Sequence, residues 1–159
     1  MIQFYTRYIF AFLVALMMQA VVSNAIQIFG WKPDLVLIIL VMFSLQHGKI
    51  AGSTAGFFAG TLSDLMSWNL LGVGALSKSV TGYTAAAVGK MMQERNRFLL
   101  TLFVSGLIHD IIFNYINTLG KEIHWWALLI LQIIPNLLYT AIVGVVIYYF
   151  LDRWLSGYE

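Results

Sequence analysis

"GFFAGTLSDLMSWNLLGVGAL", residues 56–76, places one carboxylate, Asp64, in a stretch that is otherwise mostly apolar or small. Three glycines, Gly52, Gly56 and Gly60, precede it at intervals of four residues. That interval keeps all four residues on nearly one face of a helix. Small residues on such a face let a neighbouring helix approach closely within a membrane. We therefore expect Asp64 to point into a contact between helices and not towards lipid.

The composition of the whole chain indicates a membrane as its solvent. The 159 residues are 60% hydrophobic and 10% charged, with a mean hydropathy of +0.83. A soluble domain carries about a quarter charged residues. Backbone groups that face lipid need partners within their own segment, so helix is the expected structure of each apolar run. The sequence predicts an all-α integral membrane protein that forms one domain over residues 1–159.

Composition and motifs also exclude several classes of function. The net charge of +2 is small and scattered, which argues against nucleic-acid binding. The chain has no cysteine, and it has no H-E-x-x-H, G-x-S-x-G or Walker pattern. Its three histidines fall in different segments, so a shared metal ion is not expected. His109 and Asp110 are adjacent and should point about 100° apart on a helix, which argues against a dyad. We expect no enzyme activity and no cofactor.

Six apolar runs predict six transmembrane helices. They are residues 8–29, 34–47, 50–66, 75–89, 98–118 and 125–151. A straight span needs about 20 residues, so the second, third and fourth helices should be tilted, centrally packed or extended by polar turns. The small residues Ser23–Ala25 could mimic a signal-peptide cleavage site, but we expect this first run to be retained as a helix.

Two prolines mark expected features of the second and sixth helices. Pro33 suits the first position of a helix, and Asp34 would then lie at the positive end of the helix dipole. Pro135 lies inside the sixth run and should kink that helix. Lysine and arginine residues set the expected orientation. Six of them fall on the side of the N-terminus and three on the other, so both termini should be cytoplasmic.

The remaining buried charges are expected to meet one another. Lys78 and Gly82 share a helix face by the spacing of four, as do Asp110 and Asn114. At a rise of about 1.5 Å per residue, Asp64, Lys78 and Asp110 reach a similar level in the outer half of the membrane. We expect Lys78 to lie near Asp64, Asp110 or both, because an unpaired charge in lipid is costly. A structural ion pair, a solute or proton site, and catalysis remain open for this group.

The order of these motifs resembles that of a known family. "KPDLVLIILVMFSLQHGKIAG" from residue 32, then "GFFAGTLSDL", then "LLGVGALSKSVTGY" ending at residue 83 look like MreD, the rod shape-determining membrane protein of bacteria. The resemblance covers most of the chain. The family pattern carries onto these positions: Pro33, Asp34, Gly56, Gly60, Asp64, Leu71, Gly72 and Gly82.

The resemblance implies a non-catalytic scaffold in the bacterial inner membrane. MreD proteins associate with MreC, a membrane-anchored periplasmic protein, and through it with MreB, RodA and a class B penicillin-binding protein. Such a scaffold would link the cytoskeleton to peptidoglycan synthesis, and a homodimer could form through the partner.

The family is also related in fold to S-components, the substrate-binding subunits of energy-coupling-factor transporters. That relation implies an S-component-like bundle, and it gives a small-molecule-binding transport subunit as the alternative function. Ala11 and Ala15 match the A-x-x-x-A pattern by which S-components contact their membrane partner, so this pair is a candidate partner contact.

Overall fold

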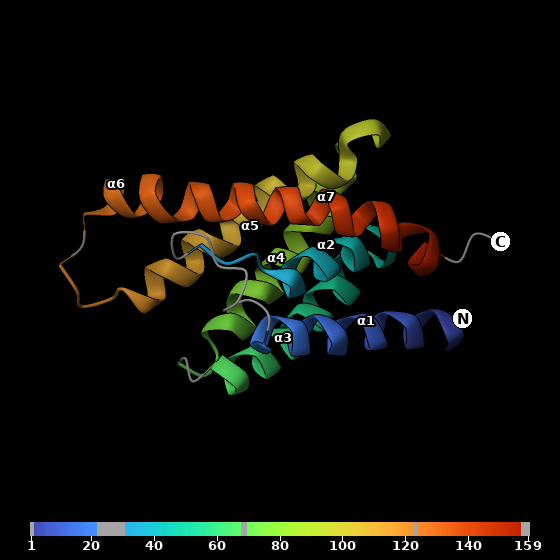
Figure 1. Ribbon diagram of the computed structural model, residues 1–159, viewed down its shortest axis with the longest axis horizontal. Coiled ribbons are helices and arrows are strands. Elements are labelled where there is room, and N and C mark those ends of the chain that lie inside the picture. The colour runs from blue at the N-terminus through green and yellow to red at the C-terminus, as the bar shows by residue number, and fades with distance from the viewer. Residues whose placement is uncertain (1, 22–30, 68–69, 123, 157–159) are drawn as a thin grey trace.

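The structure is a computed structural model that describes residues 2–21, 31–67, 70–122 and 124–156, and its described elements are all helical (Figure 1). The helices are α1 (Ile2–Val21), α2 (Leu35–His47), α3 (Lys49–Ser67), α4 (Val73–Gly89), η1 (Glu94–Asn96), α5 (Arg97–Asn117), α6 (Trp125–Leu128), η2 (Leu129–Ile133) and α7 (Ile134–Ser156). The predicted all-α fold is therefore confirmed.

Two of the described helices are long and apolar enough to cross a membrane, namely Arg97–Asn117 and the continuous run Trp125–Leu151. Thr6–Val21 and Leu35–His47 are shorter apolar helices. The described helix ends lie within two residues of the predicted runs, with two exceptions: the first helix already begins at Ile2, six residues before the predicted start, and the last helix continues beyond residue 151 to Ser156. The predicted end of the first run, with Ser23–Ala25, lies in residues 22–30, outside the described part of the chain.

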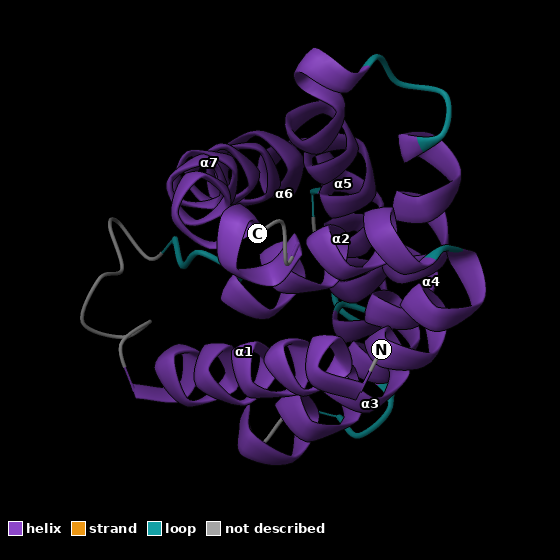
Figure 2. Cartoon of the chain, turned by 90° about the vertical axis from the view of Figure 1, so that its right-hand side faces the viewer, coloured by secondary structure: helices purple, strands orange, loops and turns teal. Residues whose placement is uncertain are grey.

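The short helix α2 forms the centre of the molecule. Ten consecutive residues, 35–44, are buried, and α2 contacts α1, α3, α4, α5 and α7. Figure 2 shows these helices around it, with α3 and α7 on different sides. Since its neighbours cover it on every side, α2 is hydrophobic around its whole circumference, as a fully buried helix should be.

Glycines bring α3 and α4 into close contact, which is the most extensive contact between two helices in the structure. A Cβ atom added to Gly52 would lie 2.7 Å from the Gly82 carbonyl oxygen. A Cβ on Gly56 would collide with the carbonyl of Lys78, and one on Gly60 with the carbonyl of Gly74. Only hydrogen fits at these positions, so the two backbones touch directly.

Pro135 interrupts the regular hydrogen bonding of the last helical run. A proline has no N–H to donate to the carbonyl four residues earlier, here that of Leu131. The structure accommodates this with the π-helical turn η2 immediately before α7. The Trp31 indole Nε1 donates to the Leu131 carbonyl at 2.9 Å. A side chain from another segment thus satisfies the acceptor that proline leaves open.

The extended segment from Trp31 to Asp34 is held along α7 by polar contacts. The Lys32 backbone N–H donates to Asn136 Oδ1 at 2.9 Å. The Asp34 backbone N–H donates to Thr140 Oγ1 at 3.2 Å. Asn136 and Thr140 are four residues apart and share a face of α7. These bonds fix where α2 begins, and they place Asp34 beside α7.

Candidate functional site

Asp34 is the N-cap residue of α2. Its Oδ1 accepts the Leu37 backbone N–H at 2.9 Å, which satisfies one of the free donors of the first helical turn. Gln19 of α1 accepts a second of these donors, the Val36 N–H, at 3.1 Å. The prediction that Pro33 occupies the first helical position was wrong, because the capping side chain of Asp34 makes α2 begin at Leu35.

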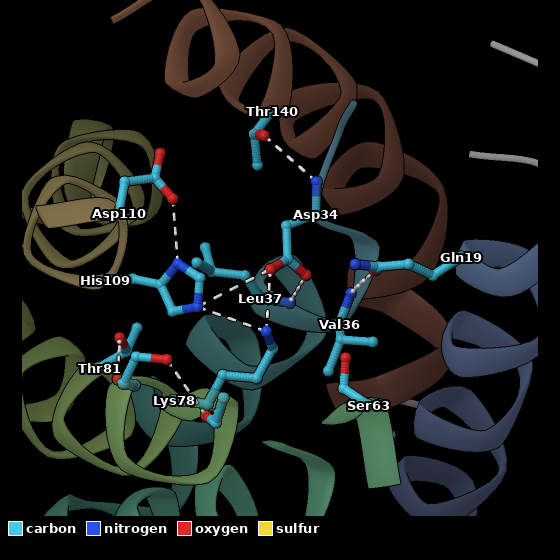
Figure 3. A network of polar contacts seen from close by, with 12 residues as sticks. Gln19, Asp34, Val36, Leu37, Ser63, Lys78, Thr81, His109, Asp110 and Thr140 are labelled. Atoms are coloured by element: carbon cyan, nitrogen blue, oxygen red, sulfur yellow. Dashed lines mark hydrogen bonds and ion pairs between the residues drawn. The ribbon is translucent and has the colours of Figure 1, made fainter. Parts of the chain in front are cut away.

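Lys78 pairs with Asp34, and not with the predicted Asp64 or Asp110. Lys78 Nζ lies 3.0 Å from Asp34 Oδ2, and the two side chains are 4% and 14% exposed. The prediction failed because the comparison of depths left out Asp34, which α2 carries into the centre of the helices (Figure 3). The two oxygens of Asp34 have separate roles: Oδ1 caps α2, and Oδ2 accepts a hydrogen bond from the Lys78 ammonium group.

His109 connects Lys78 to Asp110. Lys78 Nζ lies 3.3 Å from His109 Nε2, and His109 Nδ1 lies 3.0 Å from Asp110 Oδ1. An ammonium group can only donate, so Nε2 must accept and Nδ1 must carry the proton. In this tautomer His109 donates from Nδ1 to Asp110.

The expectation that His109 and Asp110 cannot form a dyad was therefore wrong. Their Cβ atoms do diverge around α5, but both side chains can rotate until carboxylate and ring meet (Figure 3). His109 also stacks on Phe113 one turn further along α5.

Asp64 caps α4 from outside that helix. Gly72 occupies the N-cap position of α4 in the left-handed region, with φ +99°, and has no side chain to cap with. Asp64 Oδ2 accepts the N–H groups of Gly72 at 2.9 Å, Gly74 at 3.0 Å and Ala75 at 3.3 Å. Asp64 Oδ1 also accepts the Gly74 N–H. The carboxylate of Asp64 thus supplies the cap that glycine cannot, and its charge lies at the positive end of the helix dipole.

A cavity of about 620 Å³ lies between these charged groups. Its volume falls within the usual range of small-molecule sites. Asn114, one of the predicted polar residues, lines it and donates from Nδ2 to the Asp110 backbone carbonyl at 2.8 Å. The polar side chains that line the cavity are Gln19, Lys32, Asp34, Ser63, Asp64, Ser67, Lys78, His109, Asp110, Asn114, Gln132 and Asn136. Asp64, Lys78 and Asp110 therefore share one cavity although they do not pair directly.

The arrangement of these groups is suited to binding. Within the described residues, no three His, Cys, Asp or Glu side chains are placed to hold a metal ion. The cavity offers fixed charges and amide groups on several helices. Gln19, Thr140 and Asn136 were missed in the sequence, although each is a polar residue within or next to an apolar run, which is the signal that identified Asp64.

Ala11 and Ala15, the candidate partner contact, are inside the molecule. They are 5% and 6% exposed and belong to the apolar core. Helix α1 turns this small-residue face towards its own neighbours, because two alanines allow close packing there. The prediction that this pair forms a docking surface is wrong for the folded chain.

These features define the class of protein: an all-helical protein with apolar helices long enough to span a membrane, and with buried charges that cap and connect its helices. A family profile described as rod shape-determining protein MreD matches residues 1–157. The chain belongs to this family, which confirms the resemblance and implies a structural role in rod shape determination. No curated protein and no solved structure matches the chain.

Proposed function

We propose that this protein is a non-catalytic scaffold of the rod complex that binds an MreC-type membrane protein. Through that partner it would act with MreB, RodA and a class B penicillin-binding protein, and so link the cytoskeleton to peptidoglycan synthesis. The observation that carries this proposal is the match to the MreD family over residues 1–157. The buried charges support it, because they are engaged in holding helices together.

The proposed location is the bacterial inner membrane, with six spans and both termini in the cytoplasm. The arrangement in Figure 1 is in keeping with this, since the N- and C-terminal ends lie at the same end of the molecule. The turn between α2 and α3, with Lys49, and the turn before α5, with Lys90 and Arg97, are on the side expected to be cytoplasmic by the charge rule.

An apolar stripe along η2 and α7 is the proposed binding surface for the partner's transmembrane helix. Its members follow helical spacing and all are at least 40% exposed: Leu131, Ile134, Leu138, Ile142, Val145 and Tyr149. The stripe runs nearly the whole length of the helix, as a transmembrane partner requires. Binding would depend on close packing, because lipid already solvates apolar side chains.

Cysteine cross-linking tests this surface directly, because the chain has no native cysteine. Ile142→Cys should cross-link to an MreC-type protein that carries cysteines along its single span. The matched control is Phe58→Cys on α3, which is 63% exposed against 67% for Ile142. Equal cross-linking from both positions would refute the α7 stripe. Failure to co-purify any MreC-type protein in mild detergent would refute the scaffold itself.

The cavity favours a second candidate function, a small-molecule-binding subunit like the S-components of vitamin transporters. Its volume and its polar lining are suited to a solute. Native mass spectrometry of the purified protein would test this function. A retained small molecule supports it, and a protein that neither retains nor binds any solute excludes it.

A further inference from the structure

Asp110 differs from the other cavity carboxylates in its partners. Its Oδ1 meets His109, and its second oxygen has no hydrogen-bond partner among the described residues. Figure 3 shows that second oxygen turned away from His109. Asp110 is 9% exposed and lines the cavity. The second carboxylate oxygen of this largely buried residue is therefore available to whatever enters the cavity.

The charges around the cavity do not balance at Asp110. The charge of Asp34 is compensated by Lys78 at 3.0 Å, and that of Asp64 by the backbone N–H groups at the start of α4. Lys32, the other cation of the lining, is on the exposed rim. In the tautomer that accepts from Lys78 at Nε2, His109 gives Asp110 a hydrogen bond but no positive charge. An ionised carboxylate so deeply buried is costly without a cation beside it.

From this imbalance we infer that the cavity binds a small organic ammonium group at Asp110, either as a free amine or as the head group of an aminophospholipid. The inference rests on the cavity being a ligand site, and it is independent of the MreC-type partner.

The neighbours of Asp110 on α5 are suited to such a group. Phe113 and Asn114 lie three and four residues further on and line the same cavity. An aromatic ring attracts an ammonium group whether or not that group carries N–H, and an amide oxygen accepts hydrogen bonds from a primary ammonium such as that of ethanolamine. A metal ion is a poorer fit, because the described residues contain no group of three ligating side chains. The volume of about 620 Å³ leaves room for the rest of an amine or of a head group.

A pair of probes of nearly equal shape tests the charge requirement on the wild-type protein. Choline should raise the melting temperature of the purified protein, whereas its neutral isostere 3,3-dimethylbutan-1-ol should not. Asp110→Asn should weaken choline binding roughly tenfold to a hundredfold, which is the range for losing a charged partner. Glu94→Gln is the control, since it makes the same charge change at an exposed position outside the cavity and should leave binding unchanged.

A second experiment, with lipid vesicles, identifies whether the ammonium group comes from a lipid or from a free amine. Protein extracted from vesicles of equal phosphatidylethanolamine and phosphatidylglycerol should retain phosphatidylethanolamine in native mass spectra if a head group is the ligand. Choline or ethanolamine binding without lipid retention assigns a free amine.

Any one of four results would overturn the inference. The first three are an equal response to the neutral isostere, unchanged choline binding by Asp110→Asn, and no binding of any ammonium probe. The fourth is retention of an anionic solute, which would leave the solute-binding function intact.

Discussion

The contact between α3 and α4 and the cavity bordered by α5 and α7 are built on opposite principles. At the α3–α4 contact, glycines bring two backbones together, and the one carboxylate, Asp64, is saturated by backbone N–H groups. Around the cavity, side chains from several helices leave about 620 Å³ open, and one oxygen of Asp110 has no hydrogen-bond partner in the part of the chain that the structure describes. Buried polar groups are normally satisfied, so a carboxylate oxygen that is left open towards a cavity indicates where this protein can use a charge for more than structure.

The pair of Lys78 and Asp34 joins the two regions, and breaking it should have the largest effect. Lys78→Met leaves Asp34 buried without its cation and should lower the free energy of unfolding by about 3–5 kcal/mol. Unfolding in detergent micelles would measure this loss. The double variant Asp34→Asn/Lys78→Met should be milder, because it removes both charges and asparagine still caps α2. Additive losses in the double variant would mean that the two residues do not interact.

The glycine contact gives the next largest expected effect. Gly56→Ala drives a Cβ into the Lys78 backbone carbonyl, and backbone cannot move aside as a side chain can. The expected loss in the free energy of unfolding is about 1–3 kcal/mol.

Gly144→Ala is the matched control for this prediction. A Cβ there would meet Leu102 Cδ2 at 2.6 Å, which is the far end of a flexible side chain. Both substitutions gain the same helix propensity, about 1 kcal/mol, so the difference between them isolates the backbone contact. Equal stability of the two variants would contradict the close α3–α4 contact.

Helix boundaries and the glycine face were accessible from the sequence because both depend on local spacing. The partner of Lys78 was not, since Asp34 lies 44 residues away and becomes a neighbour only when α2 occupies the centre. One feature of the sequence did point to the role of Asp64. In "LLGVG" a glycine occupies the N-cap position of α4, so the capping oxygen must come from another residue. The contact of His109 with Asp110 depends on side-chain rotation, which helical spacing does not fix.

Asp64 and Asp110, two of the three carboxylates that line the cavity, should respond differently to the same substitution. Asp64→Asn turns an amide N–H₂ towards backbone donors and should cost about 1–2 kcal/mol in the free energy of unfolding. Asp110→Asn keeps an oxygen for His109 and removes a charge without a cationic partner, so its stability should stay within about 0.5 kcal/mol of wild type or rise. Parallel thermal melts of the two variants would measure this. If both lose stability equally, Asp110 is a structural group and the contrast between the regions fails.

The smallest expected effect concerns the contact of α7 with the extended segment from Trp31 to Asp34. Polar contacts hold this segment and α7 together, whereas glycine packing holds α3 against α4. Trp31→Phe keeps a ring but removes the donor to the Leu131 carbonyl, and it should cost about 0.5–1 kcal/mol in a partly exposed site. Pro135→Ala restores a backbone N–H that can reach Leu131 instead. Trp31→Phe should therefore cost less in the Pro135→Ala background, and a double-mutant cycle of unfolding free energies measures the difference. An equal cost in both backgrounds would mean that the indole does not compensate for the proline, so α7 would be held by packing alone.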